Sequence, residues 1–373
     1  SKRGLELKLG ISGVADGRSV AIGVSLTYKD GEGYFSTYVP INHEVGENCD
    51  LVTWKKLKYV LRQGRTLIFA NAPFDFLSLE TVKIRVAEMP FYDIQTVANI
   101  ARPHFPFVKS LDMLARAYLG EDEGKVEEWP YVELNEKGRP VKETTLDWQK
   151  KNGWPDTTPE MIFHYACTDT EQTYMVWEKL MVHPGWTVQP GNVWTDKQET
   201  IRIITEMKRR GILVDIELAA QLQAEGEAAK EDLLEKLDGL NPSSVKDIPV
   251  IMLEKLGLPV LKETPAGKPS FTKEVMAQYD EILENLDRDD PEIGYVRAWR
   301  GWTTALGLLL RPYQERVSPD GRLRTSYTTH VTSTGRLSSK EPNLQQISKG
   351  DDPKPWNDRV KKCFVPKPGF TLL

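Results

Sequence analysis

The sequence predicts an α/β domain with a mixed sheet and flanking helices, followed by a mostly α-helical segment and a short β-containing C-terminal stretch. First, β-branched and aromatic runs at residues 20–28 and 33–41 flank a Lys-Asp-Gly-Glu turn, which indicates a hairpin. Second, a short apolar run at residues 66–70 lies between two segments with helical apolar spacing, which is typical of a mixed α/β order. Third, apolar residues recur at helical spacing from about residue 194 onward.

Each further element has its own local signal. The helices are expected where apolar residues repeat every three or four positions and where capping residues or glycines mark the ends. Gly226 is a candidate bend inside one of them. The Thr- and Tyr-rich stretch 322–331 favours a strand after the turn at Ser318 to Gly321. The expected helices cover residues 50–63, 194–211, 218–237, 245–256 and 297–313, and a further helix is expected to start near Thr158.

Length and composition exclude several protein classes. A chain of 373 residues favours two or three domains, and 40% hydrophobic with 28% charged residues is typical of a globular protein. The longest apolar run near the C-terminus, Ala305 to Leu310, is far shorter than the ~20 residues of a membrane helix. The cysteines Cys49, Cys167 and Cys363 have no CxxC spacing, which argues against a disulfide framework or a zinc site.

Charge is spread unevenly along the chain. The net charge is −5, yet residues 297–349 contain nine Lys or Arg against three acids, a local balance of +6. Such a basic segment on an acidic protein favours contact with a nucleic-acid backbone. On charge alone, a solvated protein face explains the pattern equally well.

Two short patterns in the first domain point to metal-dependent chemistry. Asn71 to Asp75 follows the apolar strand directly, and Pro73 suits the first turn of a helix. Tyr165 and Asp169 are four residues apart in a predicted helix, which places them on one helix face. Carboxylates arranged in this way can hold a pair of Mg²⁺ ions for phosphodiester hydrolysis. Each pattern alone is more often a helix cap or a chance pair.

A polar stretch near the C-terminus combines a glycine, an arginine and several hydroxyl and amide side chains. It runs from Thr332 to Ser339 (TSTGRLSS) and continues with Pro342 to Ile347 (PNLQQI). This set suits phosphate contacts and the minor groove, where binding is tolerant of sequence. From composition alone, a polar surface loop is the more common explanation.

The first-domain patterns resemble the second and third exonuclease motifs of the proofreading domain in family A DNA polymerases, the bacterial DNA polymerase I and phage type. The resemblance implies a ribonuclease H-like domain and a two-metal site for Mg²⁺, with Mn²⁺ as an alternative. It implies Asp75 and Asp169 as metal ligands and catalytic residues, Tyr165 as the hydroxyl that positions the water, and Asn71 as a hydrogen bonder to the DNA strand. The family's Asp-x-Glu pair has no counterpart in residues 1–18.

The TSTGRLSS and PNLQQI stretches resemble the palm segment that follows the primer–template minor groove in the same family. This likeness implies DNA contacts by Arg336, Asn343 and Gln345, with Thr334 and Ser338 shaping the path of the strand. It also implies three domains. The 3′→5′ exonuclease domain, with its first strand missing, is expected over residues 1–190. The thumb and thumb-base helices are expected over 191–317, and a truncated start of the palm over 318–373.

The resemblance leads to expectations about activity. The parent protein is expected to be a nucleotidyltransferase of DNA replication that binds primer–template duplex, a single-stranded 3′ end and dNTP. The chain itself is expected to be a fragment, inactive as a polymerase and impaired as an exonuclease. A naturally split polymerase, in which a second chain carries the rest of the palm and fingers, is a further alternative. No membrane association is expected, and the setting is the cytoplasm of a bacterium or phage-infected cell, or an organelle.

Two other functions fit parts of the sequence. One is a stand-alone DNA exonuclease with an unrelated helical appendage, against which the TSTGRLSS stretch argues. The other is a non-catalytic DNA-binding module whose exonuclease-like domain lost its first carboxylates by divergence. Residues 120–158 match neither these functions nor the polymerase family, and the sequence predicts a long loop or insertion there.

Overall fold

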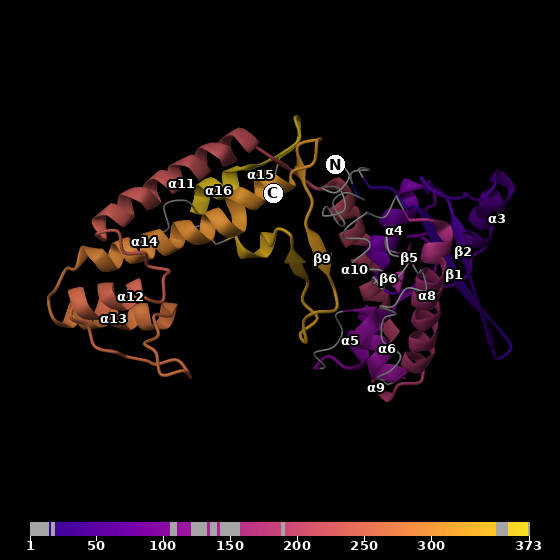
Figure 1. Ribbon diagram of the computed structural model, residues 1–373, viewed down its shortest axis with the longest axis horizontal. Coiled ribbons are helices and arrows are strands. Elements are labelled where there is room, and N and C mark those ends of the chain that lie inside the picture. Colours follow the sequence, from indigo (N-terminus) through magenta and orange to yellow (C-terminus); the bar gives the residue numbers. More distant parts are fainter. Residues whose placement is uncertain are drawn as a thin grey trace. The chain divides into compact units, whose positions relative to one another are not determined.

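The computed structural model describes residues 15, 19–104, 110–120, 133–134, 140–141, 157–187, 191–347 and 357–371. These residues form two compact units (Figure 1). Unit 1 combines residues up to Gly211 with Ser318–Glu341, and unit 2 combines Ile212–Val317 with the residues from Pro342 onward. The segment 318–341 therefore packs with the N-terminal half of the chain. The functional boundaries expected from the sequence remain a prediction.

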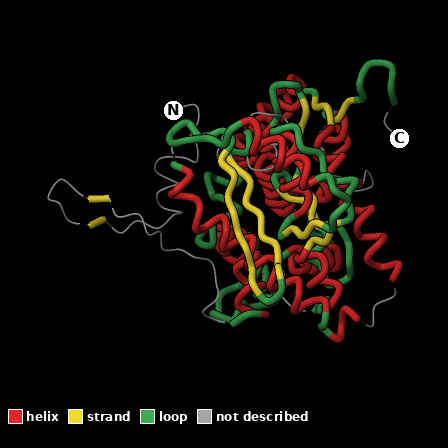
Figure 2. The backbone as a smooth tube through the Cα atoms, turned by 90° about the vertical axis from the view of Figure 1, so that its right-hand side faces the viewer, coloured by secondary structure: helices red, strands yellow, loops and turns green. Residues whose placement is uncertain are grey.

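A long antiparallel hairpin opens unit 1, as the turn chemistry predicted. β1 (Gly23–Asp30) pairs with β2 (Gly33–Pro40) along its whole length, from Gly23 opposite Pro40 to Asp30 opposite Gly33. Figure 2 shows these two strands as the longest yellow pair. Gly31 occupies the first position of the two-residue turn with φ +59°, where a side chain would be strained. The expected hairpin is confirmed.

A second, parallel pair of strands lies in the same unit. β3 (Leu67–Phe69) pairs with β4 (Phe91–Asp93). Among the described residues, β1 is joined only to β2 and β3 only to β4, so the predicted mixed sheet is present as two separate pairs.

Helices flank these strands, and their first turns are fixed by side-chain caps. Asp50, Asp93, Ser110 and Thr158 each accept a hydrogen bond from a backbone N–H of the following helix, which satisfies one of its unpaired donors. A proline is the second residue of α4 and the first residue of α8. The helices are α3 (Leu51–Leu61), α4 (Ala72–Thr81), α5 (Ile94–Ala101), α6 (Leu111–Tyr118), α8 (Pro159–Met181), α9 (Pro184–Thr187) and α10 (Gly191–Arg210).

Two hydrophobic clusters hold unit 1 together. One lies around Phe76 and Phe91, whose rings meet edge to face at 5.0 Å, and it includes Ile201 of α10. The other lies between α5, α6 and α8, around Val97, Leu114 and Val176. Because Ile201 is fully buried in the first cluster, α10 belongs to the core of unit 1.

The segment 318–341 adds three short strands to unit 1. β8 (Arg322–Leu323) is followed by β9 (Ser326–Thr328), which pairs antiparallel with β10 (Ser338–Lys340). The expected strand over 322–331 is thus divided in two and ends at Thr328. The residues between β9 and β10 form a loop that contains most of the TSTGRLSS stretch.

Unit 2 is mostly helical, as the periodicity predicted. α11 runs unbroken through Gly226, where an added Cβ would lie 2.6 Å from the Trp302 ring, so this glycine allows close packing and makes no bend. A cluster around Ile251, Met252 and Tyr279 forms a second core. The elements are β7 (Ile212–Val214), α11 (Ile216–Lys236), α12 (Asp247–Pro249), η3 (Val250–Lys255), α13 (Lys273–Asn285), α14 (Pro291–Ala305), η4 (Leu306–Leu310), α15 (Arg311–Arg316), η5 (Leu344–Gln346), α16 (Asn357–Lys362) and β11 (Phe364–Val365).

Several expectations fall on residues that the structure does not describe. In the region 120–158 the structure gives only Gly120, the strands β5 (Glu133–Leu134) and β6 (Pro140–Val141), and residues 157–158, so the predicted insertion lies outside it. The same holds for residues 1–14, where the Asp-x-Glu pair was sought. Across the described helices, none combines the length and apolar character needed to cross a membrane.

Candidate functional site: a carboxylate pocket and an arginine loop in unit 1

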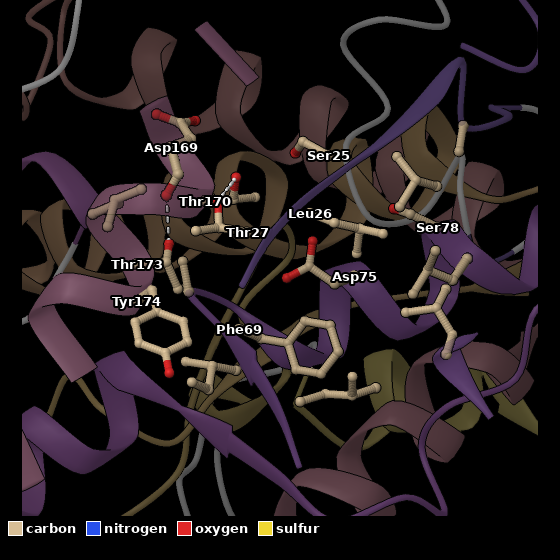
Figure 3. Close-up of a pocket in the computed structure, with 18 of the residues that line it drawn as sticks. Ser25, Leu26, Thr27, Phe69, Asp75, Ser78, Asp169, Thr170, Thr173 and Tyr174 are labelled. Atoms are coloured by element: carbon tan, nitrogen blue, oxygen red, sulfur yellow. Dashed lines mark hydrogen bonds between the residues drawn. The ribbon is translucent and has the colours of Figure 1, made fainter. Parts of the chain in front are cut away.

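A pocket of about 360 Å³ in unit 1 brings together two of the predicted site residues. Asp75 of α4 and Asp169 of α8 both line it, although 94 residues separate them in the sequence. The walls come from β1 and β3, with Thr27, Thr173 and Tyr174 adding polar groups. In Figure 3 the Asp75 carboxylate is directed into the space beside Leu26 and Phe69.

The electrostatics of Asp75 are those of a carboxyl group surrounded by other acids. Burial, followed by the charge of Asp93 and then that of Asp169, raises the pKa of Asp75 to about 7. A backbone hydrogen bond from Asn71 opposes this rise. The influence of Asp169 on this pKa also indicates that the two carboxylates are near enough to interact. A cation in the pocket would relieve their repulsion.

Asp93 is a buried acid that the sequence analysis did not single out. Its side chain is 1% exposed, and it accepts hydrogen bonds from the N–H groups of Ala72 at 2.7 Å and Thr96 at 2.8 Å. It therefore fixes the first turns of α4 and α5 together. Burial raises the pKa of Asp93 to about 6, against the lowering effect of these N–H donors. Its position directly after a strand and before a helix was a signal equal to that of Asp75.

Tyr165 and Asp169 meet on one face of α8, as their spacing predicted. Burial raises the pKa of Tyr165, and the charge of Asp169 and a hydrogen bond to its carboxylate raise it further. In Figure 3 the Asp169 carboxylate turns away from Asp75, toward the upper edge of the view. Asn71 occupies the cap position of α4 without a side-chain cap bond, is exposed, and is not among the residues that line the pocket.

The donor set fits a divalent cation only in part. Asp75 and Asp169 supply the carboxylate oxygens that Mg²⁺ prefers. Over the described residues, however, no group of three or more His, Cys, Asp or Glu side chains is placed to hold a metal ion. Among the described residues, the pocket therefore offers two carboxylates and no complete set of metal ligands.

The pocket also lies where two strand edges are free. β1 and β3 both line it, and neither pairs with a further strand in the described part of the chain. Both α4 and α8 approach the pocket with an acidic residue. Residues of two strands and one acidic residue from each of two helices therefore line the same pocket.

The predicted DNA-contact residues are divided between the two units. In unit 1, Arg336 and Thr334 are exposed on the loop between β9 and β10, and Ser338 begins β10 half-buried. In unit 2, the side chain of Asn343 accepts a hydrogen bond from the Gln345 N–H at 3.0 Å and so caps η5, while Gln345 itself is exposed.

Much of the C-terminal basic charge is already engaged within the protein. Arg300 donates to the carbonyls of Pro242 and Phe271, at distances from 2.7 to 3.2 Å. Arg324 is buried and forms two hydrogen bonds with Asp320. The +6 balance of the sequence therefore overstates the charge that is available to a partner, because arginines also hold backbone carbonyls. Arg336 is an exposed arginine of this segment.

The sequence is similar to known DNA polymerases. Residues 215–373 match the sequence model of DNA polymerase family A. This part of the chain is related to family A DNA polymerases. DNA polymerase I of Pseudomonas aeruginosa is 28% identical over 390 aligned positions, which cover 94% of this chain and 37% of that protein. DNA polymerase I of Streptococcus pneumoniae serotype 4 is 30% identical over 170 residues, or 44% of this chain and 18% of that protein.

A solved structure supports the same fold. The POL domain of Pol1 from M. smegmatis, in complex with DNA primer-template and dNTP, superposes with a TM-score of 0.63 at 18% identity. The superposition covers 97% of this chain and 58% of that one. The chain thus spans less than two thirds of each of these relatives. It matches 37% of the Pseudomonas aeruginosa polymerase and 18% of the Streptococcus pneumoniae polymerase.

Proposed function

We propose that this chain is part of a DNA-directed DNA polymerase of family A that carries a 3′→5′ proofreading exonuclease. One observation carries the proposal: the similarity to DNA polymerase I of Pseudomonas aeruginosa extends over 94% of the chain, well beyond the family A match at residues 215–373. It therefore includes unit 1 residues as well as the polymerase segment. The partners are primer–template DNA, a single-stranded 3′ end and, for the parent protein, dNTP.

The carboxylate pocket is the proposed exonuclease site. Asp75 and Asp169 would hold Mg²⁺ or Mn²⁺, which supplies positive charge to a phosphodiester and lowers the pKa of a water molecule. Tyr165 is already hydrogen-bonded to Asp169, so its hydroxyl lies beside the proposed ligand and can orient a water. Burial, and after it the charges of Asp93 and Asp169, raise the pKa of Asp75, and a bound cation would offset the cost of its negative charge.

The free edges of β1 and β3 provide a place for the missing ligands. A strand between them would hydrogen-bond to both neighbours and join the two pairs into one sheet. Residues two apart on a strand point to the same face, so an Asp-x-Glu pair on it would direct both carboxylates toward Asp75 and Asp169. Residues 1–18 contain no Asp-x-Glu pair, so we propose that a strand with the family's first exonuclease motif would supply it. The proposed site has four carboxylates once it is present.

The loop between β9 and β10 is the proposed duplex contact. Arg336 is exposed there beside Gly335, whose lack of a side chain permits close approach of a DNA strand. Such contacts position the duplex without selecting a sequence. Asn343 and Gln345 of unit 2 are proposed to contribute further hydrogen bonds.

Binding of a fluorescent primer–template duplex tests the polymerase part of the proposal. Arg336→Ala should weaken binding by about tenfold, since a charged contact contributes about 1 to 3 kcal/mol. It should also reduce the slope of log K against log salt by about 1. Arg62→Ala, an exposed arginine next to α3, is the matched control and should bind as the parent does. Equal losses in both variants would contradict the proposal.

We expect the isolated chain to show no template-directed dNTP incorporation and only feeble degradation of single-stranded DNA. Both reactions need clustered carboxylates, and the described residues offer two in the pocket and no group of three. Primer extension and 3′-end digestion with Mg²⁺ or Mn²⁺ measure these activities. Robust digestion by the 373-residue chain would contradict the four-carboxylate site.

A further inference from the structure

The loop between β9 and β10 is tied to the N-terminal part of unit 1 at three points. The Thr96 and Thr329 hydroxyl groups share a hydrogen bond of 2.8 Å. The Asn99 amide donates to the Thr332 carbonyl at 3.3 Å. All the donors and acceptors belong to the same compact unit, although 233 residues separate each pair.

The third point is an ammonium group on α10. Lys197 Nζ donates to the Gly335 carbonyl at 3.0 Å, immediately before Arg336 in the chain. Lys197 is partly buried, and burial lowers its pKa from the ordinary value. An ammonium group that is removed from water gains more from a carbonyl acceptor than an exposed one does. This contact therefore fixes the peptide unit that joins Gly335 to Arg336.

The loop itself is arranged around that contact. Gly335 has φ +72°, a conformation that a residue with a side chain would adopt only with strain. Thr332 Oγ1 donates to the Arg336 carbonyl at 2.7 Å, which closes the loop across four residues. The Arg336 side chain is left exposed.

The supporting helices are rigid for separate reasons. α5 carries Thr96 and Asn99, which are 0% and 6% exposed, and its first turn is capped by Asp93. α10 carries Lys197, and Ile201 one turn later is fully buried in the core.

We propose that Lys197 and Asn99 are positioning residues that hold the 329–336 loop in the conformation that presents Arg336 to duplex DNA. The inference rests on the proposed DNA contact of Arg336. It assigns a polymerase role to two residues that precede the segment 215–373, which matches the polymerase family. Neither residue needs to contact DNA.

A double-mutant cycle on duplex binding tests this inference with the full chain. Lys197→Met keeps the aliphatic stem and removes the ammonium, and it should weaken binding of a labelled primer–template duplex about fivefold or more. Lys197→Arg keeps a charged donor and should bind within about twofold of the parent. Lys55→Met, an exposed lysine of α3, is the matched control and should have no effect.

The cycle separates positioning from direct contact. In an Arg336→Ala background, Lys197→Met should cause no further loss of affinity and no further change in the salt slope, because it acts only through the arginine. Additive losses, with a salt slope lower by about another 0.9, would show that Lys197 itself contacts a phosphate and would overturn the inference. Parental affinity of Lys197→Met would overturn it too.

Hydrogen exchange measures the loop without DNA. Amides of residues 333–337 should exchange faster in Lys197→Met and in Asn99→Ala, while the core of α8 stays protected. Unchanged exchange in both variants would contradict the inference that Lys197 and Asn99 hold the loop in place. If Arg336→Ala binds duplex like the parent, the DNA role of the loop and this inference both fail. If Arg336→Ala is weakened and Lys197→Met is not, only the inference fails.

Discussion

His330 gives a direct test of how the β9–β10 segment is held in unit 1. The ring is 8% exposed, and burial, followed by the charges of Lys208 on α10 and Lys340 on β10, lowers the pKa of His330 to about 4. Lys208 is itself 2% exposed, and burial lowers its pKa to about 8 despite the favourable charge of Asp93. A further positive charge on the buried His330 ring, beside these two lysines, is therefore unfavourable.

The sign of the pH effect follows from proton binding. Between pH 6.5 and 4 the unfolded state binds a proton at His330 while the folded state does not, so the free energy of unfolding falls as the pH is lowered. Because the pKa of His330 is about 4 in the folded state and 6.5 in the unfolded state, the free energy of unfolding is lowered by about 2 kcal/mol at pH 5 and by about 3 kcal/mol below pH 4. Above pH 6.5 His330 is neutral in both states, so it causes no loss in the free energy of unfolding.

The perturbation is His330→Gln, which cannot be protonated. Between pH 7.5 and pH 5 the parent should lose about 2 kcal/mol more of its free energy of unfolding than the variant. Denaturant unfolding at the two pH values measures the difference, and hydrogen exchange of residues 326–340 localises it. His164→Gln, an exposed histidine of α8, should behave as the parent. Equal pH dependence of the parent and His330→Gln would refute the reasoning.

Two other predictions concern burial. Gly226→Ala should destabilise unit 2 by about 1 to 3 kcal/mol, because the added methyl group would lie 2.6 Å from the Trp302 ring. Denaturant unfolding measures this loss of stability, and unchanged stability would contradict the close packing of Gly226 against Trp302. Asp75→Asn should raise the melting temperature in EDTA at pH 8 by a few degrees and by less at pH 5, since ionisation of the buried carboxyl above its pKa of about 7 is costly. Mn²⁺ should stabilise the parent and not this variant; an equal metal effect on both would contradict the role of Asp75.

Local signals in the sequence were enough for most elements of the fold. The hairpin followed from two β-branched and aromatic runs around the turn at Gly31, and α4 and α8 followed from a proline near the start of each helix. These features depend on residues close in sequence, where turn and cap chemistry decide the backbone. Gly226 was misread as a candidate bend, because the Trp302 ring that requires a glycine there comes from a residue 76 positions away.

The candidate site was predictable in its acids and less so in its surroundings. Asp75 and Asp169 line one pocket, and Tyr165 reaches Asp169, as helix spacing indicated. The role of Asp93 depends on two N–H donors from different helices, and no local pattern encodes that. The basic C-terminal segment was overestimated because Arg300 and Arg324 hold internal acceptors.

The most direct test of the proofreading assignment is to complete the pocket. A strand with an Asp-x-Glu pair, joined through a flexible linker ahead of Ser1, should give Mg²⁺-dependent 3′→5′ digestion of single-stranded DNA. The same fusion with Asn-x-Gln, and the active fusion with Asp169→Asn, should digest no faster than the chain alone. If the Asp-x-Glu fusion is as inactive as its Asn-x-Gln control, the pocket between β1 and β3 is not a nuclease site.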